Sequence, residues 1–471
     1  MSPTKKARVP HPGRAERAEL GKKARQRAPL AALADYESAD GRRDPVELLG
    51  QEDASRVADL VPIRYGRMLT SPFAFYRGAA VLMAGDLATT SSTGLSAQLC
   101  GDAHMSNFGI FGSPERRLVF DVNDFDETHP GPFEWDVKRL AASLEIAGRG
   151  NGFTKKQRKK IVLAAANSYR KAMRNFAKQS NLGVWYASVD MDQVMSEYGD
   201  RLAPKRRKVT EAGIAKARTR DSMQAFSKLA TIVDGEPRII SNPPLVVPIE
   251  EVFSERSADE LQLALVKLVR SYRRTLAADR QHLLETYRLV HVARKVVGVG
   301  SVGTRAWILL MEGIDGADPM FLQAKEAGAS VLEPFTSKSK FKNQGERVVA
   351  GQTLMQAVSD IFLGWQGVDG DDGVRRDYYV RQLRDWKGSA VVEEMVPDGM
   401  AIYARLCGWT LARAHARSGD RVAIASYLGA KETFDSAIAT FAVAYADQNE
   451  RDFAQMQRAV ESGRVAVQTG L

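Results

Sequence analysis

The chain of 471 residues contains only two cysteines, Cys100 and Cys407. Two thiols are too few for the disulfide framework of a small secreted protein. The chain also lacks an apolar run of the roughly 18 residues that a membrane-spanning helix needs, and its first residues lack the apolar core of a secretory signal. We therefore expect a cytoplasmic protein that has no membrane partner.

Two common kinds of catalytic site are missing as well. The six histidines are scattered along the chain rather than clustered, which argues against a zinc site. The Gly-x-Ser-x-Gly turn that presents the nucleophile of many serine hydrolases does not occur in the sequence. Zinc-dependent and serine-hydrolase chemistry therefore have no support.

The net charge of +10 is concentrated near one end of the chain. Residues 1–30 hold nine Lys and Arg side chains against two Glu, together with Pro, Gly and few apolar residues. This composition is typical of a disordered segment, and it lacks the aromatic residues that accompany basic ones in many nucleic-acid sites. We expect a disordered basic tail and no specific nucleic-acid partner.

Composition changes several times along the rest of the chain, which is long enough for a bilobal protein. A part that mixes helix and strand is followed by a mainly helical region, then by a glycine-rich β region, then by further helices. The expected divisions are a disordered basic tail at 1–43, the catalytic-loop part of a C-lobe at 44–153, a helical substrate-side region at 154–290, an N-lobe-like β region at 291–395 and helices that complete the C-lobe at 396–471.

Two short polar segments each follow a predicted strand. Asp102 comes directly after the first strand, and Asn107 lies five residues further along the same loop. Asp124 and Asp126 follow the second strand, 118–122. In phosphoryl transfer an Asp accepts the proton of the attacking hydroxyl, while an Asn and a second Asp hold the metal ion that bridges the ATP phosphates. The pattern therefore predicts a magnesium-phosphate site.

The run Gly101–Asn107, Gly-Asp-Ala-His-Met-Ser-Asn, resembles the catalytic loop of aminoglycoside and choline phosphotransferases, whose pattern is roughly Gly-Asp-x-His-x-x-Asn. The run Asp124–Asp126, Asp-Phe-Asp, resembles the metal-binding segment of the same enzymes. In that family an Asp twelve residues after the metal-binding Asp begins a helix and braces the catalytic loop, and Asp136 has this position. The resemblance implies an enzyme that uses ATP and Mg²⁺. The catalytic residues that it implies are Asp102 and His104.

The metal ligand after the second strand has two candidates. Counting forward from Asn107, as in family members with short loops, reaches Asp121, whereas counting back from Asp136 reaches Asp124. Because side chains alternate along a strand, these two residues face opposite sides. The Asp-Phe-Asp context favours Asp124, and the alternative interpretation of Asp121 is a hydrogen-bonded strand residue. The metal-binding residues that the comparison implies are Asn107, Asp124, Asp121 and Asp126.

A nucleotide-clamping lobe carries a glycine-rich turn between two strands and then a strand lysine. Nothing of this kind precedes the catalytic loop, but residues 298–303, Gly-Val-Gly-Ser-Val-Gly, stand between two apolar segments, and Lys325 lies in the strand-like segment that follows. A plain β-hairpin turn and a solvated lysine are the alternative interpretations. The expected cofactor-binding residues are Gly298, Gly300, Ser301, Gly303 and Lys325.

Two helices complete the comparison with kinases, which brace the strand lysine with a Glu from the next helix. The helix expected from about residue 346 to residue 362 offers Glu346 at its start or Gln352 nearer its middle. The segment 402–416 is apolar on nearly all sides, which indicates a buried helix. It resembles the helix that leads into a kinase catalytic loop.

These parts occur in an unusual order, because the catalytic loop precedes the glycine-rich turn by about two hundred residues. We therefore expect an α+β, protein-kinase-like bilobal fold that is circularly permuted and carries a helical insertion. The expected function is ATP- and Mg²⁺-dependent phosphoryl transfer to the hydroxyl of an unidentified small-molecule or protein substrate. A nucleotide-binding pseudoenzyme and an AMP-transferring kinase-like protein are the alternatives.

A second resemblance covers nearly the whole chain past residue 44. The segments 67–73 and 360–365, together with the catalytic-loop region, resemble the bacterial domain-of-unknown-function family 2252. That family carries no established activity, so the expected function depends on the kinase-like motifs.

Overall fold

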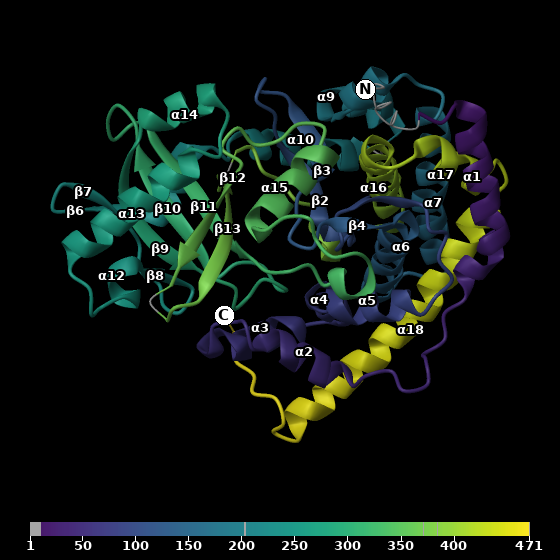
Figure 1. Cartoon of the computed structure of the whole chain (residues 1–471), viewed down its shortest axis with the longest axis horizontal. Helices are drawn as coiled ribbons and strands as arrows, with labels where there is room; N and C mark the ends of the chain where they lie inside the picture. The colour runs from purple at the N-terminus through teal and green to yellow at the C-terminus, as the bar shows by residue number, and fades with distance from the viewer. Residues whose placement is uncertain (1–10, 202–203, 371, 384, 471) are drawn as a thin grey trace, which may run out of the picture.

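The computed structural model describes residues 11–201, 204–370, 372–383 and 385–470. The chain forms an α+β structure with a sheet lobe on one side and a larger helical lobe on the other (Figure 1). Among the described residues, no helix is long and apolar enough to cross a membrane.

The sheet lobe is built on six antiparallel strands in the order β12-β13-β11-β10-β9-β8. Their bounds are β8 Val246–Pro248, β9 Arg288–Lys295, β10 Ala306–Glu312, β11 Pro319–Ala327, β12 Gly364–Asp369 and β13 Arg375–Gln382. Helix α15, Gln344–Met355, connects β11 to β12 and lies between the two lobes in Figure 1. It is shorter than the helix expected to reach residue 362.

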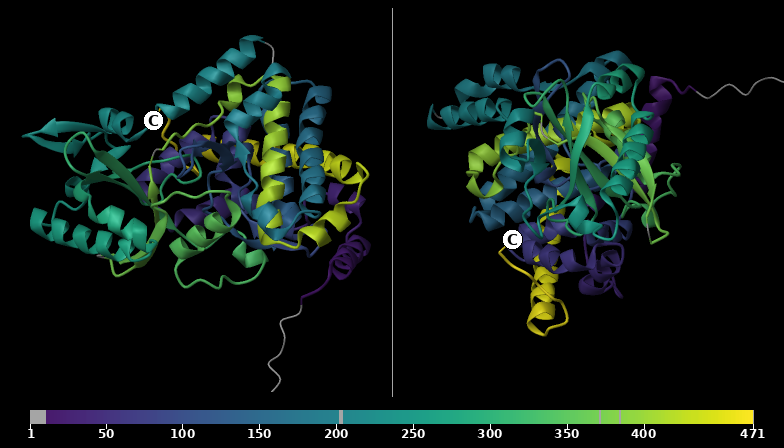
Figure 2. Two further views of the ribbon diagram at one scale, coloured as in Figure 1. Left: turned by 90° about the horizontal axis from the view of Figure 1, so that it is seen from above. Right: turned by 90° about the vertical axis from the view of Figure 1, so that its left-hand side faces the viewer.

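The two faces of this sheet bury different apolar side chains, because residues alternate along each strand. On one face Met311 and Leu322 pack with Tyr272 and Leu284 from the α13–α14 region, where α13 is Ala258–Arg273 and α14 is Ala278–Glu285. On the other face Ile308, Leu310 and Phe321 pack with α11, Ser222–Leu229, and with the hairpin of β6, Ala230–Val233, and β7, Glu236–Ile239. The hairpin projects at the outer end of the sheet lobe (Figure 2).

The helical lobe is organised around α6, Phe133–Gly150, α7, Lys155–Phe176, and α16, Pro397–Ser418. Small residues let α16 approach α7 closely: a methyl group on Gly408 would lie 2.3 Å from the carbonyl oxygen of Ala165. The long helix α18, Thr433–Glu461, packs across α6 and α7. The expected apolar helix 402–416 is the buried centre of α16.

Short strands and helices complete this lobe. Strand β1, Ser96–Leu99, pairs with β4, His129–Pro132, and β3, Leu118–Val122, lies between β2, Phe108–Gly112, and β5, Val189–Asp190. The remaining helices of the chain are α2 Pro45–Asp53, α3 Val61–Met68, α4 Pro72–Gly78, α5 Ala80–Ala88, α8 Asn181–Tyr186, α9 Met191–Tyr198, α10 Pro204–Arg218, α12 Ile249–Val252 and α17 Arg421–Leu428.

The prediction that residues 1–43 form a disordered tail is wrong for much of that segment. Residues Arg14–Arg27 form helix α1, which packs along α17. Gly21 makes this possible, because a methyl group there would lie 2.1 Å from the carbonyl oxygen of Ala423, and Arg25 Nε donates a hydrogen bond of 2.8 Å to Tyr427 O. Of the basic side chains in this helix, Arg14, Lys22 and Lys23 are exposed, whereas Arg17 forms an ion pair with Asp420. Residues 1–10 lie outside the described part of the chain.

The region 154–290 does not form one helical unit. Helix α7 belongs to the helical lobe, whereas α11, α13, α14 and the hairpin β6–β7 cover the sheet. The sequence analysis missed this division, because helical periodicity shows that a face is buried but not what covers it.

Candidate functional site

The loop that follows β1 is held by one carboxylate. Asp136, in the first turn of α6, accepts hydrogen bonds from the backbone nitrogens of Cys100 and Gly101, at 2.8 and 3.1 Å. Gly101 has φ +83°, and a methyl group there would lie 2.1 Å from the carbonyl oxygen of Glu127, so the turn requires glycine. Asp136 thus contacts the loop as the sequence comparison implied.

Asp102 follows this turn, and its carboxylate lies beside the guanidinium group of Arg139. Arg139 approaches Asp102 Oδ1 at 2.7 Å through Nη2 and at 2.8 Å through Nε. The side-chain amide of Asn107 donates to the Asp102 carbonyl oxygen at 2.6 Å. Arg139 was not predicted, although it stands one helical turn after Asp136 and therefore on the same face of α6.

His104 lies on the other side of the Asp102 carboxylate. Its Nε2 is 3.5 Å from Asp102 Oδ2, and the side chain is buried. Desolvation lowers the pKa of His104 to about 4 against the pull of Asp102, so the ring is neutral at pH 7. Within the described structure its Nδ1 is buried without a hydrogen-bond partner.

The acidic segment after β3 meets the lysine of the sheet lobe. Lys325 Nζ contacts Asp126 directly and lies 3.8 Å from Asp124 Oδ2. Tyr379 Oη, from β13, donates to Asp126 Oδ1 at 2.8 Å. Two carboxylates thus share one ammonium group, and this leaves a surplus negative charge in a buried place.

The pKa values of these groups reflect the shared charge. Burial disfavours ionised Asp124, but Lys325 and Arg381 outweigh it and lower the pKa of Asp124 to about 2. Burial, followed by repulsion from Asp124, raises the pKa of Asp126. Burial also disfavours the Lys325 ammonium, but the two carboxylates reverse this and raise its pKa.

Asp121 is not near this lysine. It is buried in β3, faces α16 and pairs with Arg413, while its Oδ2 accepts a hydrogen bond of 2.8 Å from the backbone nitrogen of Ala357. These partners occupy the carboxylate, so Asp121 holds β3 to its neighbours. Asp124 lies beyond the end of β3, so strand alternation does not set its direction; its side chain faces Lys325 instead.

The glycine-rich turn connects two antiparallel strands, β9 and β10, and does not enter a helix. Two arginines hold it: Arg56 Nη1, from the loop after α2, donates to the carbonyls of Gly300 and Val302 at 2.8 and 2.7 Å, and Arg67 Nη1, from α3, donates to Gly298 O at 2.8 Å. A methyl group on Gly300 would lie 3.0 Å from the carbonyl oxygen of Arg77. The turn therefore rests on α3 and α4.

A cleft of about 130 Å³ brings most of the predicted residues together. Glu127 and the arginines 56 and 77 also line it, and burial raises the pKa of Glu127 to about 7. The sequence analysis did not identify these three. The predicted residues in its wall are Asp102, His104, Asn107, Asp124, Asp126, Gly298, Gly300 and Ser301.

Helix α15 braces the acidic segment rather than the lysine. Arg347 donates to the carbonyl oxygens of Asp126 and Thr128, at 2.8 and 2.6 Å. Glu346 stays at the capped start of the helix, and Gln352 pairs with Gln356, which donates to Val122 O at 2.7 Å. Among the described contacts neither Glu346 nor Gln352 is the partner of Lys325.

Carboxylates and amide oxygens are ligands that Mg²⁺ accepts, and the surplus negative charge at Asp124 and Asp126 fits a cation. Within the described residues, however, no group of three or more His, Cys, Asp or Glu side chains is arranged to hold a metal ion. A metal ion here would therefore take the rest of its ligands from phosphate oxygens and water, as Mg²⁺ commonly does.

No curated protein and no solved structure matches this chain. Residues 56–459 match the model of a family described as an uncharacterized protein conserved in bacteria. The matched segment contains the whole cleft except Glu52. The chain therefore belongs to the DUF2252 family of uncharacterized bacterial proteins.

Proposed function

We propose that the protein is an ATP- and Mg²⁺-dependent phosphotransferase that acts on a hydroxyl group. The observation that carries the proposal is the meeting of Asp102, Asn107 and Asp124 from the helical lobe with Lys325 and the glycine-rich turn from the sheet lobe. Each of these groups has a known task in phosphoryl transfer.

The sequence of elements in the sheet lobe supports a protein-kinase-like fold. The chain runs from β9 through the glycine-rich turn to β10, then to β11 with Lys325, then through α15 to β12 and β13. A glycine-rich loop over the phosphates, a lysine on the third strand and a following helix are the kinase arrangement. This lobe follows the catalytic loop in the chain, so the fold that we propose is circularly permuted.

The junction between α16 and β1 is consistent with the permutation. Ser418 Oγ, at the end of α16, accepts a hydrogen bond of 3.1 Å from the backbone nitrogen of Gln98, and Gly419 lies against Ser96 and Ala97. A chain that continued from α16 into β1 would have the usual order of a glycine-rich lobe, a buried helix and a catalytic loop. Permutation is tolerated where such ends lie close together.

The residues of the cleft then have separate tasks. Asp102 accepts the proton of the acceptor hydroxyl, the acceptor oxygen bonds to the γ-phosphorus of ATP, and the bond from that phosphorus to the bridging oxygen breaks to release ADP. Arg139 fixes the direction of the Asp102 carboxylate. Asn107, Asp124 and Asp126 would hold Mg²⁺, which offsets phosphate charge when it is bound. Lys325 is then free to turn from Asp126 to the phosphates.

The size of the cleft adds a condition to this mechanism. Its volume of about 130 Å³ is below the roughly 300–1,000 Å³ of ligand pockets, so it accommodates phosphate groups but not a whole nucleotide. Nucleotide binding must therefore move the two lobes apart. The contacts of Arg56 and Arg67 with the glycine-rich turn are the ones that such a movement has to break.

One observation favours a second candidate, a nucleotide-binding protein without turnover. The Arg139 guanidinium contacts Asp102 Oδ1 at 2.7 and 2.8 Å, and it therefore competes with an acceptor hydroxyl for that oxygen. AMP transfer is a third candidate, because a metal site alone does not determine which phosphorus is attacked.

Calorimetry with ATP, in the presence and absence of Mg²⁺, tests the proposal. We expect binding that requires Mg²⁺ and that Asp124→Asn abolishes, while Asp398→Asn, at an exposed site, leaves it unchanged. Equal binding with and without Mg²⁺, or no binding in either condition, would refute the proposal. Incubation with ATP and a metabolite mixture then distinguishes the candidates, because release of ADP, release of pyrophosphate and no release correspond to phosphoryl transfer, AMP transfer and a silent protein.

A further inference from the structure

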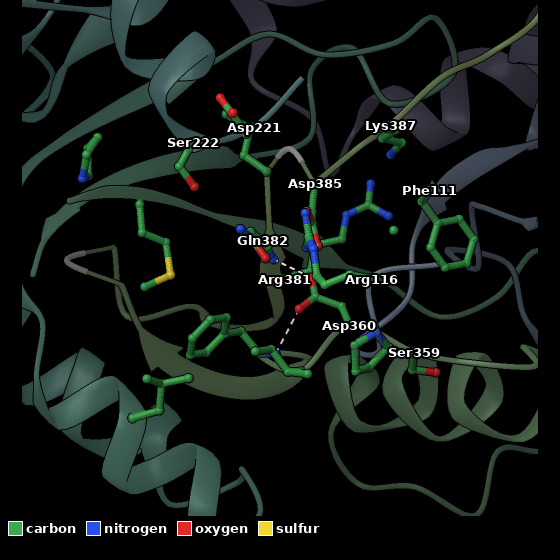
Figure 3. Close-up of a pocket in the computed structure, with 18 of the residues that line it drawn as sticks. Phe111, Arg116, Asp221, Ser222, Ser359, Asp360, Arg381, Gln382, Asp385 and Lys387 are labelled. Carbon is green, nitrogen blue, oxygen red and sulfur yellow. Dashed lines mark hydrogen bonds and ion pairs between the residues drawn. The ribbon is translucent and has the colours of Figure 1, made fainter. Parts of the chain in front are cut away.

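A second and larger cavity lies on the other side of the acidic segment. Its volume is about 460 Å³, and Asn123 lines it whereas the next residue, Asp124, lines the cleft. The segment that follows β13 forms one wall, and this segment pairs with β2 through Ile110 and Gly388. Figure 3 shows Arg381, Arg116 and Asp385 near the middle of the cavity, with Lys387 and Phe111 to one side.

Among the described residues, Arg116, Arg381 and Lys387 are the cationic side chains that line this cavity, and only Arg116 forms a direct ion pair there. Arg116 Nη1 contacts both carboxylate oxygens of Asp385, at 2.7 and 2.9 Å. Arg381 donates only to uncharged oxygens: Nη1 lies 3.1 Å from Asn123 O, and Nε lies 3.4 Å from Gln323 Oε1. In the part of the chain that the structure describes, the Lys387 ammonium has no hydrogen bond or ion pair.

The other carboxylates that line the cavity accept hydrogen bonds from backbone nitrogens. Asp360 accepts hydrogen bonds from the backbone nitrogens of Phe362 and Gln382, at 2.8 and 2.5 Å. Asp221 caps α11 through the backbone nitrogen of Gln224, at 2.9 Å. Asp318 accepts hydrogen bonds of 3.3 Å from the backbone nitrogen of Ile314 and from Tyr287 Oη. None of these three carboxylates forms a direct ion pair with Arg381 or Lys387.

Lys387 lines the same cavity as Arg381. Burial disfavours the Arg381 guanidinium, but nearby acidic groups outweigh it and raise the pKa of Arg381, whereas the Lys387 ammonium has no ion-pair partner among the described residues. Repulsion from Arg381, followed by burial, lowers the pKa of Lys387 to about 7 despite the attraction of Asp124. An anion between the two groups would remove the repulsion and replace the lost hydration.

We propose that this cavity binds a small organic anion, whose phosphate or carboxylate group lies between Arg381 and Lys387. The uncharged part of the ligand lies against the apolar side of the wall, which Phe111, Met320 and Phe362 form. The volume is within the range of small-molecule sites. This site is separate from the cleft of Asp102 and does not depend on the function proposed for that cleft.

The test uses three aromatic probes of similar size with the full chain, at about pH 6, where Lys387 is charged. Calorimetry should detect binding of phenyl phosphate or of phenylacetate. The probe that binds more tightly shows whether the site prefers a phosphate or a carboxylate group. Benzyl alcohol, the uncharged probe, should not bind. Absence of binding by both anions, or equal binding of benzyl alcohol, would overturn the proposal.

Variants locate the site. Lys387→Met should weaken anion binding by about tenfold or more, the scale of a charge-assisted hydrogen bond, and Lys387→Arg should keep most of it. Lys228→Met, an exposed lysine on α11, is the matched control and should change nothing. Arg381→Gln is an independent second variant, and thermal unfolding verifies that each variant is folded. Unchanged binding in folded Lys387→Met and Arg381→Gln would place the anion elsewhere.

A competition experiment distinguishes this proposal from the function proposed for the cleft of Asp102. Phenyl phosphate should bind equally in the presence of saturating ATP and Mg²⁺ if the two sites are separate. Displacement of phenyl phosphate by ATP would show that the cavity is part of the nucleotide site, and this would overturn the proposal of a separate site. Anion binding without any ATP binding would support this inference while refuting the proposed function.

Discussion

Replacement of Lys325 tests the charge balance on which the cleft depends. Lys325 has only 4% of its side chain exposed and is shared by Asp124 and Asp126. Lys325→Met keeps the length and removes the charge, so Asp124 and Asp126, whose side chains are 32% and 26% exposed, lose the cation that they share. Because breaking a fully buried pair costs about 3–5 kcal/mol and an exposed pair contributes less than about 1 kcal/mol, this half-buried arrangement should cost about 1–3 kcal/mol. We expect a fall of this size in the free energy of unfolding at pH 7.

A matched control is available on the surface. Lys160 forms a 3.0 Å ion pair with Asp398, but 63% of its side chain is exposed. Lys160→Met should cost less than about 1 kcal/mol, because exposed pairs contribute little. Urea unfolding of the wild type and both variants measures the difference. Equal losses in the two variants would refute the view that Lys325 neutralises a half-buried acidic pair.

The pH dependence gives an independent check. The pKa of Asp124 is lowered to about 2 in the folded chain, so the stabilisation is present above the ordinary Asp value near 4 and is lost as the pH falls through about 2. The cost of Lys325→Met should therefore be full at pH 7 and decline as the pH falls towards about 2, below which Asp124 is protonated in both chains. A cost that does not change with pH would point to lost packing instead.

Magnesium should compensate for the missing ammonium. If Asp124 and Asp126 hold Mg²⁺, the ion replaces the cation in Lys325→Met, whereas in the wild type it competes with Lys325. Binding at a concentration of 100 times Kd adds about 2.7 kcal/mol. We expect Mg²⁺ to stabilise the variant more than the wild type, and no stabilisation of the variant would contradict the metal assignment.

Three further predictions concern other residues of the cleft. Asp102→Asn should slow transfer by about 10²–10⁴ with little change in ATP affinity, because a base acts on the acceptor rather than on the nucleotide; retained turnover would rule out Asp102 as the base. Asp121→Asn should lower the melting temperature and leave Mg²⁺ affinity unchanged, whereas Asp124→Asn should weaken Mg²⁺ binding; thermal unfolding and metal titration compare the two variants. Arg56→Gln should release the glycine-rich turn and speed ATP association in stopped-flow measurements, and an unchanged rate would show that this contact does not limit opening.

The part of the site that lies within one short stretch of the chain could be predicted from the sequence. Asp102, Asn107 and Asp124 stand at short, fixed distances along the chain, and such spacing survives folding almost unchanged. The position of Lys325 required a comparison with the order of elements in kinases. The contact of Arg139 with Asp102 could not be predicted in the same way. It depends on the direction in which Arg139 points from α6, and that direction has meaning only when the position of Asp102 is known.

Other features depended on long-range packing. The composition of the first residues suggested disorder, but Gly21 allows α1 to lie on α17, which is encoded about four hundred residues later. Likewise, nothing in the local sequence of α11 indicates that it covers Phe321 rather than the helical lobe. The cations Arg381 and Lys387 stand in an unremarkable segment, and their shared cavity exists only in the folded chain.

The separation of Asp126 from Lys325 has a consequence for synthesis of the chain. The two side chains are 199 residues apart in sequence, and translation at about 5–20 residues per second needs roughly 10–40 s to cover that distance. During this interval the acidic segment has emerged from the ribosome without its counter-charge, and α16, against which Asp121 packs, emerges later still. The loop Gly101–Asn107 is thus made early but takes up its final structure late, and until Lys325 is made the carboxylates of the acidic segment stay hydrated and ionised in the nascent chain.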